Sequence, residues 1–253
     1  MTGRRRRLFD RLLVYLPLAL LTLFLLAPFY WMVITALKPD SELYSASASP
    51  LVVQRPTLIA LLFGVPAGYA MARLRFRGRE ALGLAIFATY LIPGTLLFIP
   101  MHQIVNRLGL LDSPFALIVV YPTFMTPFCT WLLAGYFKTI PGELEESARV
   151  DGCSRFGAMV RIALPLATPG ILSAAIFAFT ASWNEFLYAL TLVTSSDLRT
   201  LPLGIVAALL NSDAFPWGKL MAGALLGSIP VAVVYSFFVE HYASGLTSGA
   251  IKG

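Results

Sequence analysis

Charged side chains are scarce in this sequence of 253 residues: Asp, Glu, Lys and Arg together make up 13% of it. Soluble globular domains carry about 25% charged residues, so this chain is not built to expose its whole surface to water. Apolar residues supply 58% of the sequence, and its mean hydropathy is +0.77. The composition therefore indicates a protein whose surface lies largely in lipid.

Residues that bind metals or form disulfides are also few. The two cysteines and two histidines stand far apart, without the spacing of metal ligands or of a disulfide framework: Cys129, Cys153, His102 and His241. A membrane-embedded enzyme would need a nucleophile, a base or a metal set that converge, and these residues do not supply one. The phosphate-binding pattern Gly-x4-Gly-Lys-(Ser/Thr) is missing as well. We therefore expect no catalytic centre, metal or cofactor in this chain.

Long apolar segments are abundant. A helix needs about 20 apolar residues to cross the hydrocarbon core, and six segments are candidates: Leu12–Leu37, Thr57–Ala72, Ala81–Met101, Pro114–Phe137, Ala167–Val193 and Gly218–His241. The first is too long for a signal peptide and is expected to be retained as a span. The sequence thus predicts an all-α membrane protein with six transmembrane helices in a single domain, residues 1–253.

The positive charges indicate how these spans are oriented. Lys and Arg accumulate on the cytoplasmic side of membrane proteins, and a cytoplasmic N-terminus places 14 of the 19 basic residues inside and 5 outside. Both termini, the loop 138–166 and the basic turn Arg73–Arg79 are then cytoplasmic, while residues 194–217 form an external loop. The basic turn is expected to anchor the chain against anionic lipid.

The loop 138–166 carries the most specific pattern. Its residues in order are Glu146, Ser147 and Ala148, three further residues, Gly152, nine further residues, and then Ile162, Leu164 and Pro165. This order resembles the cytoplasmic coupling motif of ABC importer permeases, Glu-Ala-Ala-x3-Gly-x9-Ile-x-Leu-Pro, with Ser147 in place of the second residue. The resemblance implies that an ATPase docks here, and that Glu145, Glu146 and Asp151 meet it or brace the loop. An ordinary amphipathic loop is the alternative.

The same loop has the local signals of two short helices. Pro141 suits a helix start and is followed by acidic residues, which the helix dipole favours in a first turn. Gly152 can end that helix in a left-handed conformation. A second helix is expected from Ser154, with Phe156, Met159, Val160 and Ile162 on its apolar face.

The C-terminal tail, residues 242–253, narrows the family. It ends in Leu246, Thr247, Ser248, Gly249, Ala250, Ile251, Lys252 and Gly253, which is similar to the ending Gly-Leu-Thr-x-Gly-(Ala/Gly)-Val-Lys-Gly of maltose-type carbohydrate permeases. In that family the tail reaches into the ATPase dimer, so the resemblance implies the same contact here. A frayed chain end is the alternative.

Polar groups inside the fifth span indicate a substrate pathway. Ionisable and amide side chains are costly in a membrane and usually face a bundle interior or a water-filled cavity. Trp183, Asn184, Glu185 and Tyr188 offer the aromatic faces and polar groups that sugars bind, and similar permeases carry Trp-Asn-(Asp/Glu)-Phe in a helix that lines the pathway. These side chains could instead bond or pack against a neighbouring helix.

The external loop offers a second contact site. In maltose-type permeases the corresponding loop reaches into the solute-binding protein, which the resemblance assigns here to Asn211, Ser212, Asp213 and Phe215. A plain surface loop is the alternative.

The second span is the weakest of the six. Leu58 to Met71 gives only about 14 clearly apolar residues, and the stretch 45–56 before it is expected to be a short polar linker. The permeases that this sequence resembles have roughly 30 more residues here, in a longer external loop and a longer second helix. Either the protein has a true deletion, or residues before Thr57 are missing from the sequence. We favour the second, because a shortened helix would leave backbone groups unsatisfied in lipid.

These patterns predict the permease subunit of an ATP-driven, binding-protein-dependent importer of oligosaccharides, disaccharides or related polyols such as glycerophosphodiesters. The family implies a second, non-identical permease, a pair of ATPase subunits that bind ATP and Mg, and an extracytoplasmic solute-binding protein, at a bacterial or archaeal plasma membrane. A permease for a non-sugar solute is one alternative. An ion-coupled transporter is the other, although only Glu185 lies deep in a span. The identity of the sugar is left open.

Overall fold

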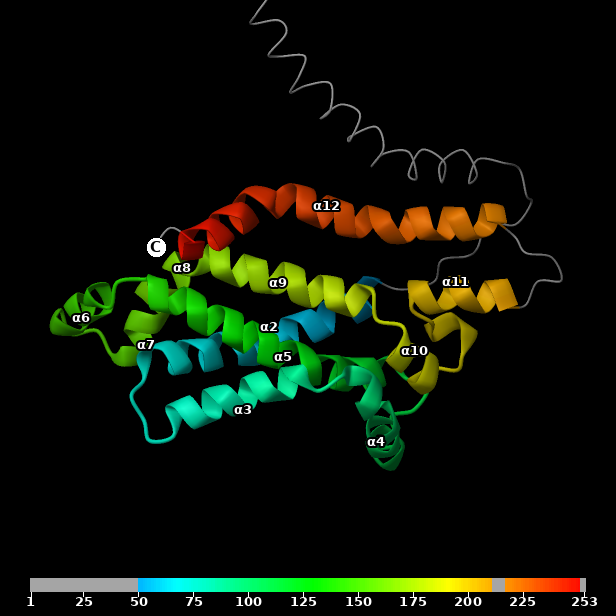
Figure 1. Ribbon diagram of the computed structural model, residues 1–253, viewed down its shortest axis with the longest axis horizontal. Helices are drawn as coiled ribbons and strands as arrows, with labels where there is room; N and C mark the ends of the chain where they lie inside the picture. The colour runs from blue at the N-terminus through cyan, green and yellow to red at the C-terminus, as the bar shows by residue number, and fades with distance from the viewer. Residues whose placement is uncertain (1–49, 211–216, 251–253) are drawn as a thin grey trace, which may run out of the picture. The chain divides into compact units, whose positions relative to one another are not determined.

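The computed structural model describes residues 50–210 and 217–250, and every regular element in these two ranges is helical (Figure 1). The predicted first span, Leu12–Leu37, lies outside them. The described residues fall into two compact units, one containing Ile205–Pro230 and the other containing 50–204 and 231–250. Among the described residues, two helices are long and apolar enough to cross a membrane, or up to four if each of two bent helix pairs is counted as one span.

Helix α5, Pro114–Thr139, is the centre of the larger unit. One face of α5 is fully buried. Its residues follow one another at intervals of four, which is the spacing of neighbours along a helix face: Leu117, Tyr121, Met125, Cys129, Leu133 and Phe137. Helices α2 (Pro50–Arg73), α3 (Arg79–Leu91) and α9 (Thr168–Trp183) pack around it. Ser113 begins α5 by accepting a hydrogen bond from the backbone N–H of Phe115 at 3.0 Å.

Two glycines let α2 approach α5 closely. A Cβ atom on Gly68 would lie 2.8 Å from the Cβ of Leu133, and one on Gly64 would lie 3.1 Å from the Cβ of Cys129. Glycines four residues apart on one face of a helix are a common device for close packing of membrane helices. The helix begins at Pro50, so the expectation of a linker up to Pro56 is wrong from Pro50 onward, where the proline occupies a favourable first position.

The predicted third span is not one straight helix. Helices α3 and α4 (Gly94–Arg107) meet at an angle of 93°. Ile92 is extended, as a residue before proline tends to be, and Pro93 has no N–H to continue the helix. Three other prolines, Pro100, Pro122 and Pro127, remain inside α4 and α5.

The predicted fifth span is broken as well. Helix α9 ends at Trp183, and α10 (Leu187–Leu192) begins three residues after Asn184. The Asn184 side-chain amide donates to the backbone carbonyl of Thr180 at 2.9 Å, while the Glu185 carboxylate accepts from the first N–H groups of α10. These two side chains satisfy backbone groups at the break, which explains why a continuous helix over Ala167–Val193 is the wrong prediction.

The last part of the chain is more helical than expected. Residues 194–217 were expected to form a loop, but they contain a short 3-10 turn, η2 (Ser196–Leu198), and α11 (Leu201–Leu210). Because the 201–210 segment is almost entirely apolar, a helix is its more favourable state near a membrane. Helix α12, Trp217–Ala250, starts one residue before the predicted sixth span and continues through most of the predicted tail.

Candidate functional site

The predicted coupling loop forms a compact pair of short helices. Helix α6, Glu143–Val150, follows Pro141 and Gly142 and has three acidic residues in its first turn. Gly152 then takes a φ of +90°, a left-handed conformation that favours glycine. The chain turns there and α6 ends, as the sequence predicts.

The second half of the loop begins with a capped helix. The Ser154 hydroxyl accepts a hydrogen bond from the backbone N–H of Gly157 at 3.0 Å, which starts α7, Arg155–Ala158. A π-helical turn, η1 (Met159–Ala163), and α8 (Leu164–Leu166) complete the segment. A bend of 74° then separates α7–α8 from α9, so the motif spans the connection between α5 and α9.

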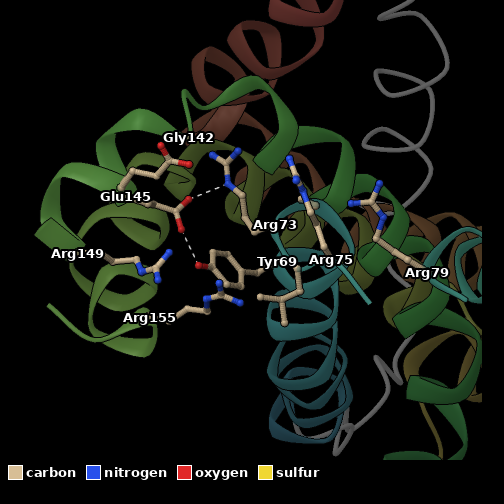
Figure 2. A pocket seen from close by; sticks show the side chains of 11 residues that line it. Tyr69, Arg73, Arg75, Arg79, Gly142, Glu145, Arg149 and Arg155 are labelled. Carbon is tan, nitrogen blue, oxygen red and sulfur yellow. Dashed lines mark hydrogen bonds and ion pairs between the residues drawn. The ribbon is translucent and has the colours of Figure 1, made fainter. Parts of the chain in front are cut away.

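Glu145 holds this pair of helices to α2. It is buried, and its carboxylate accepts from Arg73 Nε at 2.7 Å and from the Tyr69 hydroxyl at 2.6 Å (Figure 2). Arg73 Nη2 also donates to the backbone carbonyl of Ile140 at 2.6 Å. The exposed fractions of the Arg73 and Glu145 side chains are 17% and 9%. This arrangement fixes α6 and the chain before it to the end of α2.

The sequence analysis missed Tyr69 and Arg73 as partners of the motif. The two residues are four apart and therefore share one face at the end of α2. That spacing was a usable signal, but the pairing with Glu145 joins segments more than 70 residues apart in sequence.

The outer surface of the two helices is partly apolar. Glu146 and Asp151 are exposed, as are the large apolar side chains of Val150 and Phe156, whose exposed fractions are 87% and 72%. Leu144 is exposed as well. An exposed apolar surface flanked by acidic groups is typical of an interaction site.

The other residues of the motif differ in exposure. Ser147 and Pro165 are exposed, whereas Ala148, Ile162 and Leu164 are half-buried. Of the predicted apolar face of the second helix, Met159 packs against the core while Phe156 and Val160 remain exposed.

The residues assigned to a substrate pathway lie at the break between α9 and α10. Glu185 accepts from the Tyr121 hydroxyl at 2.8 Å and from the N–H groups of Tyr188 and Ala189 at 2.8 and 3.1 Å. Tyr188 is buried, and its hydroxyl donates to the backbone carbonyl of Gly94 at 2.8 Å.

These bonds tie α5, α10 and the break between α3 and α4 to one another. The other two members of the segment are more accessible, since Asn184 is exposed and Trp183 is half-buried against Phe179. Lining of a pathway by these four residues stays a prediction.

Of the two predicted contact sites, the external one falls outside the described residues and the tail falls outside them in part. Asn211, Ser212, Asp213 and Phe215 lie outside them, as do Ile251, Lys252 and Gly253. For Leu246, Thr247, Ser248, Gly249 and Ala250 the structure describes a helical backbone. Within the described ranges, no group of three or more His, Cys, Asp or Glu residues is arranged to hold a metal ion.

Residues 64–248 match the protein family described as binding-protein-dependent transport system inner membrane component. The chain is 32% identical to the inner membrane ABC transporter permease protein YcjP of Escherichia coli K12, over 98% of this chain and 99% of the relative. It is 36% identical to the sulfoquinovosyl glycerol transport system permease protein SmoH of Agrobacterium fabrum C58, over 90% and 89%. The alignment with YcjP extends over 278 positions, so YcjP has residues that this chain lacks.

The fold is also similar to that of solved importers. A chain from the crystal structure of a bacterial ABC transporter involved in the import of the acidic polysaccharide alginate has a TM-score of 0.66 at 22% identity, covering 96% of this chain and 99% of that one. A chain of the MetNI methionine ABC transporter in an inward-facing conformation has a TM-score of 0.58 at 17% identity, covering 78% and 94%.

Proposed function

Because the chain belongs to the family of binding-protein-dependent transport system inner membrane components, we propose that it is the permease subunit of an ATP-driven importer of sugars. The chain is a multi-pass membrane protein. The relatives of this chain include permeases named for the transport of sulfoquinovosyl glycerol, of trehalose and maltose, and of diacetylchitobiose. These names support oligosaccharides, disaccharides and glycosylated polyols as the substrate class, in agreement with the ending of the tail.

One observation carries the proposal. The motif 146–165 covers most of the short helix α6 and all of α7. Glu145 attaches them to Arg73 of α2, and Glu146, Val150 and Phe156 are exposed on their outer surface. A small helical element that is fixed to a span and has an unpartnered outer surface is suited to receive a displacement from a soluble partner. The loop is cytoplasmic in the orientation that the basic residues favour.

The partner at this surface is a separate ATPase subunit, which binds ATP and Mg. The importer further contains a second, non-identical permease and an extracytoplasmic solute-binding protein, and a solved importer with a bound periplasmic protein supports the last of these. The tail from Leu246 onward contacts the ATPase dimer, and the segment 211–215 contacts the binding protein.

The transport cycle follows from linkage between these sites. A ligand shifts a conformational equilibrium only when it binds one state more tightly than the other. ATP in the closed ATPase dimer and the loaded binding protein must therefore both favour the outward-facing permease. Hydrolysis removes one of the two ligands and returns the permease to its inward-facing state, which releases the sugar.

The test is the ATPase activity of the reconstituted complex with and without loaded binding protein. We expect Glu146→Ala to abolish the stimulation by the binding protein while the complex still assembles. Glu143→Ala is the matched control, because Glu143 is also an exposed acid on α6 but is outside the motif. Normal stimulation of the Glu146→Ala complex would refute the coupling role of this surface.

A further inference from the structure

A cavity rich in arginine lies between the end of α2, the start of α3 and the helices α6 and α7. Its volume is about 630 Å³, and the guanidinium groups that line it come from Arg73, Arg75, Arg79, Arg149 and Arg155 (Figure 2). These residues belong to both the basic turn and the coupling loop. The cavity therefore joins two features that the sequence analysis treated separately.

The positive charge of this cavity is not balanced by the protein. Its lining holds five arginines but two carboxylates, Glu145 and Glu146, which leaves an excess of three positive charges. Glu145 already pairs with Arg73, and this is the single ion pair in the part of the chain that the structure describes. Arg75, Arg79, Arg149 and Arg155 thus line the cavity without an ion pair to a carboxylate there, and an anion in the cavity would relieve their mutual repulsion.

Arginine also determines which anion fits. The planar guanidinium group donates paired hydrogen bonds to phosphate oxygens and remains charged at any physiological pH. Arg75 lies in the α2–α3 connection and Arg79 begins α3, whereas Arg149 and Arg155 come from the α6–α7 segment. A phosphate group between them would be contacted from two sides.

The surroundings of the cavity favour a lipid as the source of the phosphate. Arg73 ends α2, which covers the predicted second span, and basic residues at the cytoplasmic end of a span lie beside the lipid headgroups. Helix α3 starts at the cavity with Arg79 and has no buried residue along its length. Leu82 and Leu84 in its first two turns are exposed apolar side chains, as is Phe76 in the connection. Acyl chains can lie along this surface while the headgroup enters the cavity.

We propose that this cavity binds the phosphate headgroup of an anionic phospholipid. The bound lipid bridges the α2–α3 connection and the α6–α7 segment, and so lies directly beside the Arg73–Glu145 ion pair that holds the coupling helices. Lipid composition would then act on the same contact that transmits movement. The inference concerns anion binding by this chain and stands independently of the sugar specificity proposed above.

The experiment measures lipid binding to the purified complex in detergent. The complex is delipidated and titrated with dioleoyl phosphatidylglycerol or dioleoyl phosphatidylcholine, and the bound lipid is counted by native mass spectrometry. We expect the wild-type complex to retain phosphatidylglycerol and not phosphatidylcholine. In Arg75→Gln/Arg79→Gln the affinity for phosphatidylglycerol should be roughly tenfold or more lower, because each lost charge-assisted hydrogen bond is worth about a factor of ten.

Arg77 provides the matched control. It is an exposed arginine in the same connection, but it does not line the cavity. Arg77→Gln should therefore retain phosphatidylglycerol as the wild type does. Equal losses in Arg77→Gln and Arg75→Gln/Arg79→Gln would show a general surface charge effect and overturn the proposal.

Two further arms distinguish the source of the anion. Inorganic phosphate and soluble glycerophosphoglycerol are added as competitors, and binding of either as tightly as the lipid would overturn the lipid assignment. The titration is repeated after the ATPase subunits have been removed. If phosphatidylglycerol binds only when the ATPase subunits are absent, the ATPase occupies this cavity in the complex, and the proposal is overturned.

Discussion

Two adjacent glutamates on α6 have opposite surroundings. Glu145 is buried against Tyr69 and Arg73, whereas Glu146 is exposed. Successive residues of an α-helix point about 100° apart, so one short helix can be anchored by one carboxylate and offer the next to a partner. In the sequence the two stand in the same acidic run, and local pattern alone does not separate their roles.

Stability and coupling should therefore respond differently to these two residues. Glu145→Ala leaves the Arg73 guanidinium and the Tyr69 hydroxyl without their acceptor in a mostly buried place, and we expect a loss of roughly 3 kcal/mol in the free energy of unfolding. Glu146→Ala should change it by less than about 0.5 kcal/mol, as exposed substitutions generally do. Thermal unfolding of the purified complex measures both, and equal melting temperatures would contradict the anchoring role of Glu145.

A second carboxylate holds two connections together. Asp112, at a φ of +54°, accepts from the Ser195 hydroxyl and from the N–H groups of Ser195 and Thr194 at 2.8 and 2.9 Å. These bonds, the Ser195 hydroxyl first among them, lower the pKa of Asp112 from 3.8 to about 2. Because the pKa falls on folding, the stabilisation is complete above pH 3.8 and is lost as the pH falls toward 2.

The difference in melting temperature between wild type and Asp112→Asn should accordingly be constant from pH 7 to pH 5 and shrink as the pH falls below about 4. Asparagine tolerates positive φ, so the substitution removes the charge without straining the backbone. Asp197→Asn, at an exposed aspartate of the neighbouring turn, is the control and should show no such difference. A difference between wild type and Asp112→Asn that does not vary with pH would exclude the ionised clamp.

At the scale of elements, apolar length and composition predicted that helices would form but not where they would break. Hydropathy is a property of a window of residues, and the segments on both sides of Pro93 and of Asn184 are apolar. Whether a proline breaks a helix depends on the neighbouring backbone, since Pro93 lies at the break while Pro100, Pro122 and Pro127 stay inside helices. The coupling loop was better predicted because its signals are local: an acidic first turn, Gly152 and a capping serine.

The packing of α2 on α5 is open to a direct test. Gly68→Val places side-chain atoms where a Cβ would already lie 2.8 Å from the Cβ of Leu133, so we expect a loss of about 3 kcal/mol or more in stability. Gly135→Ala in α5 is the control, because nothing lies within 4 Å of the added Cβ, and alanine is the better helix former by up to about 1 kcal/mol. A Gly68→Val complex that unfolds at the wild-type temperature would contradict this contact.

At the scale of the whole molecule, the two native cysteines report on assembly. Cys153 lies between α6 and α7 and is half-buried, whereas Cys129 is fully buried in α5. If the ATPase docks on the coupling helices, a maleimide reagent should label Cys153 several-fold more slowly in the complete complex than in the permease pair alone. Cys129 should stay unlabelled in both, which checks that the fold is intact. Equal labelling rates for Cys153 would place the ATPase elsewhere.

The close approach of α2 to α5 at Gly64 and Gly68 has a mechanical consequence. Helices separated by long side chains can slide as those side chains change rotamer, but here α2 contributes no side chain at the point of closest approach and packs directly against Cys129 and Leu133 of α5. We expect α2 and α5 to move as one stiff body during transport. A push on α6 reaches α2 through Glu145 and is then carried by both helices at once, so in the described part of the chain we expect hinges at the helix breaks, such as those beside Pro93 and Asn184.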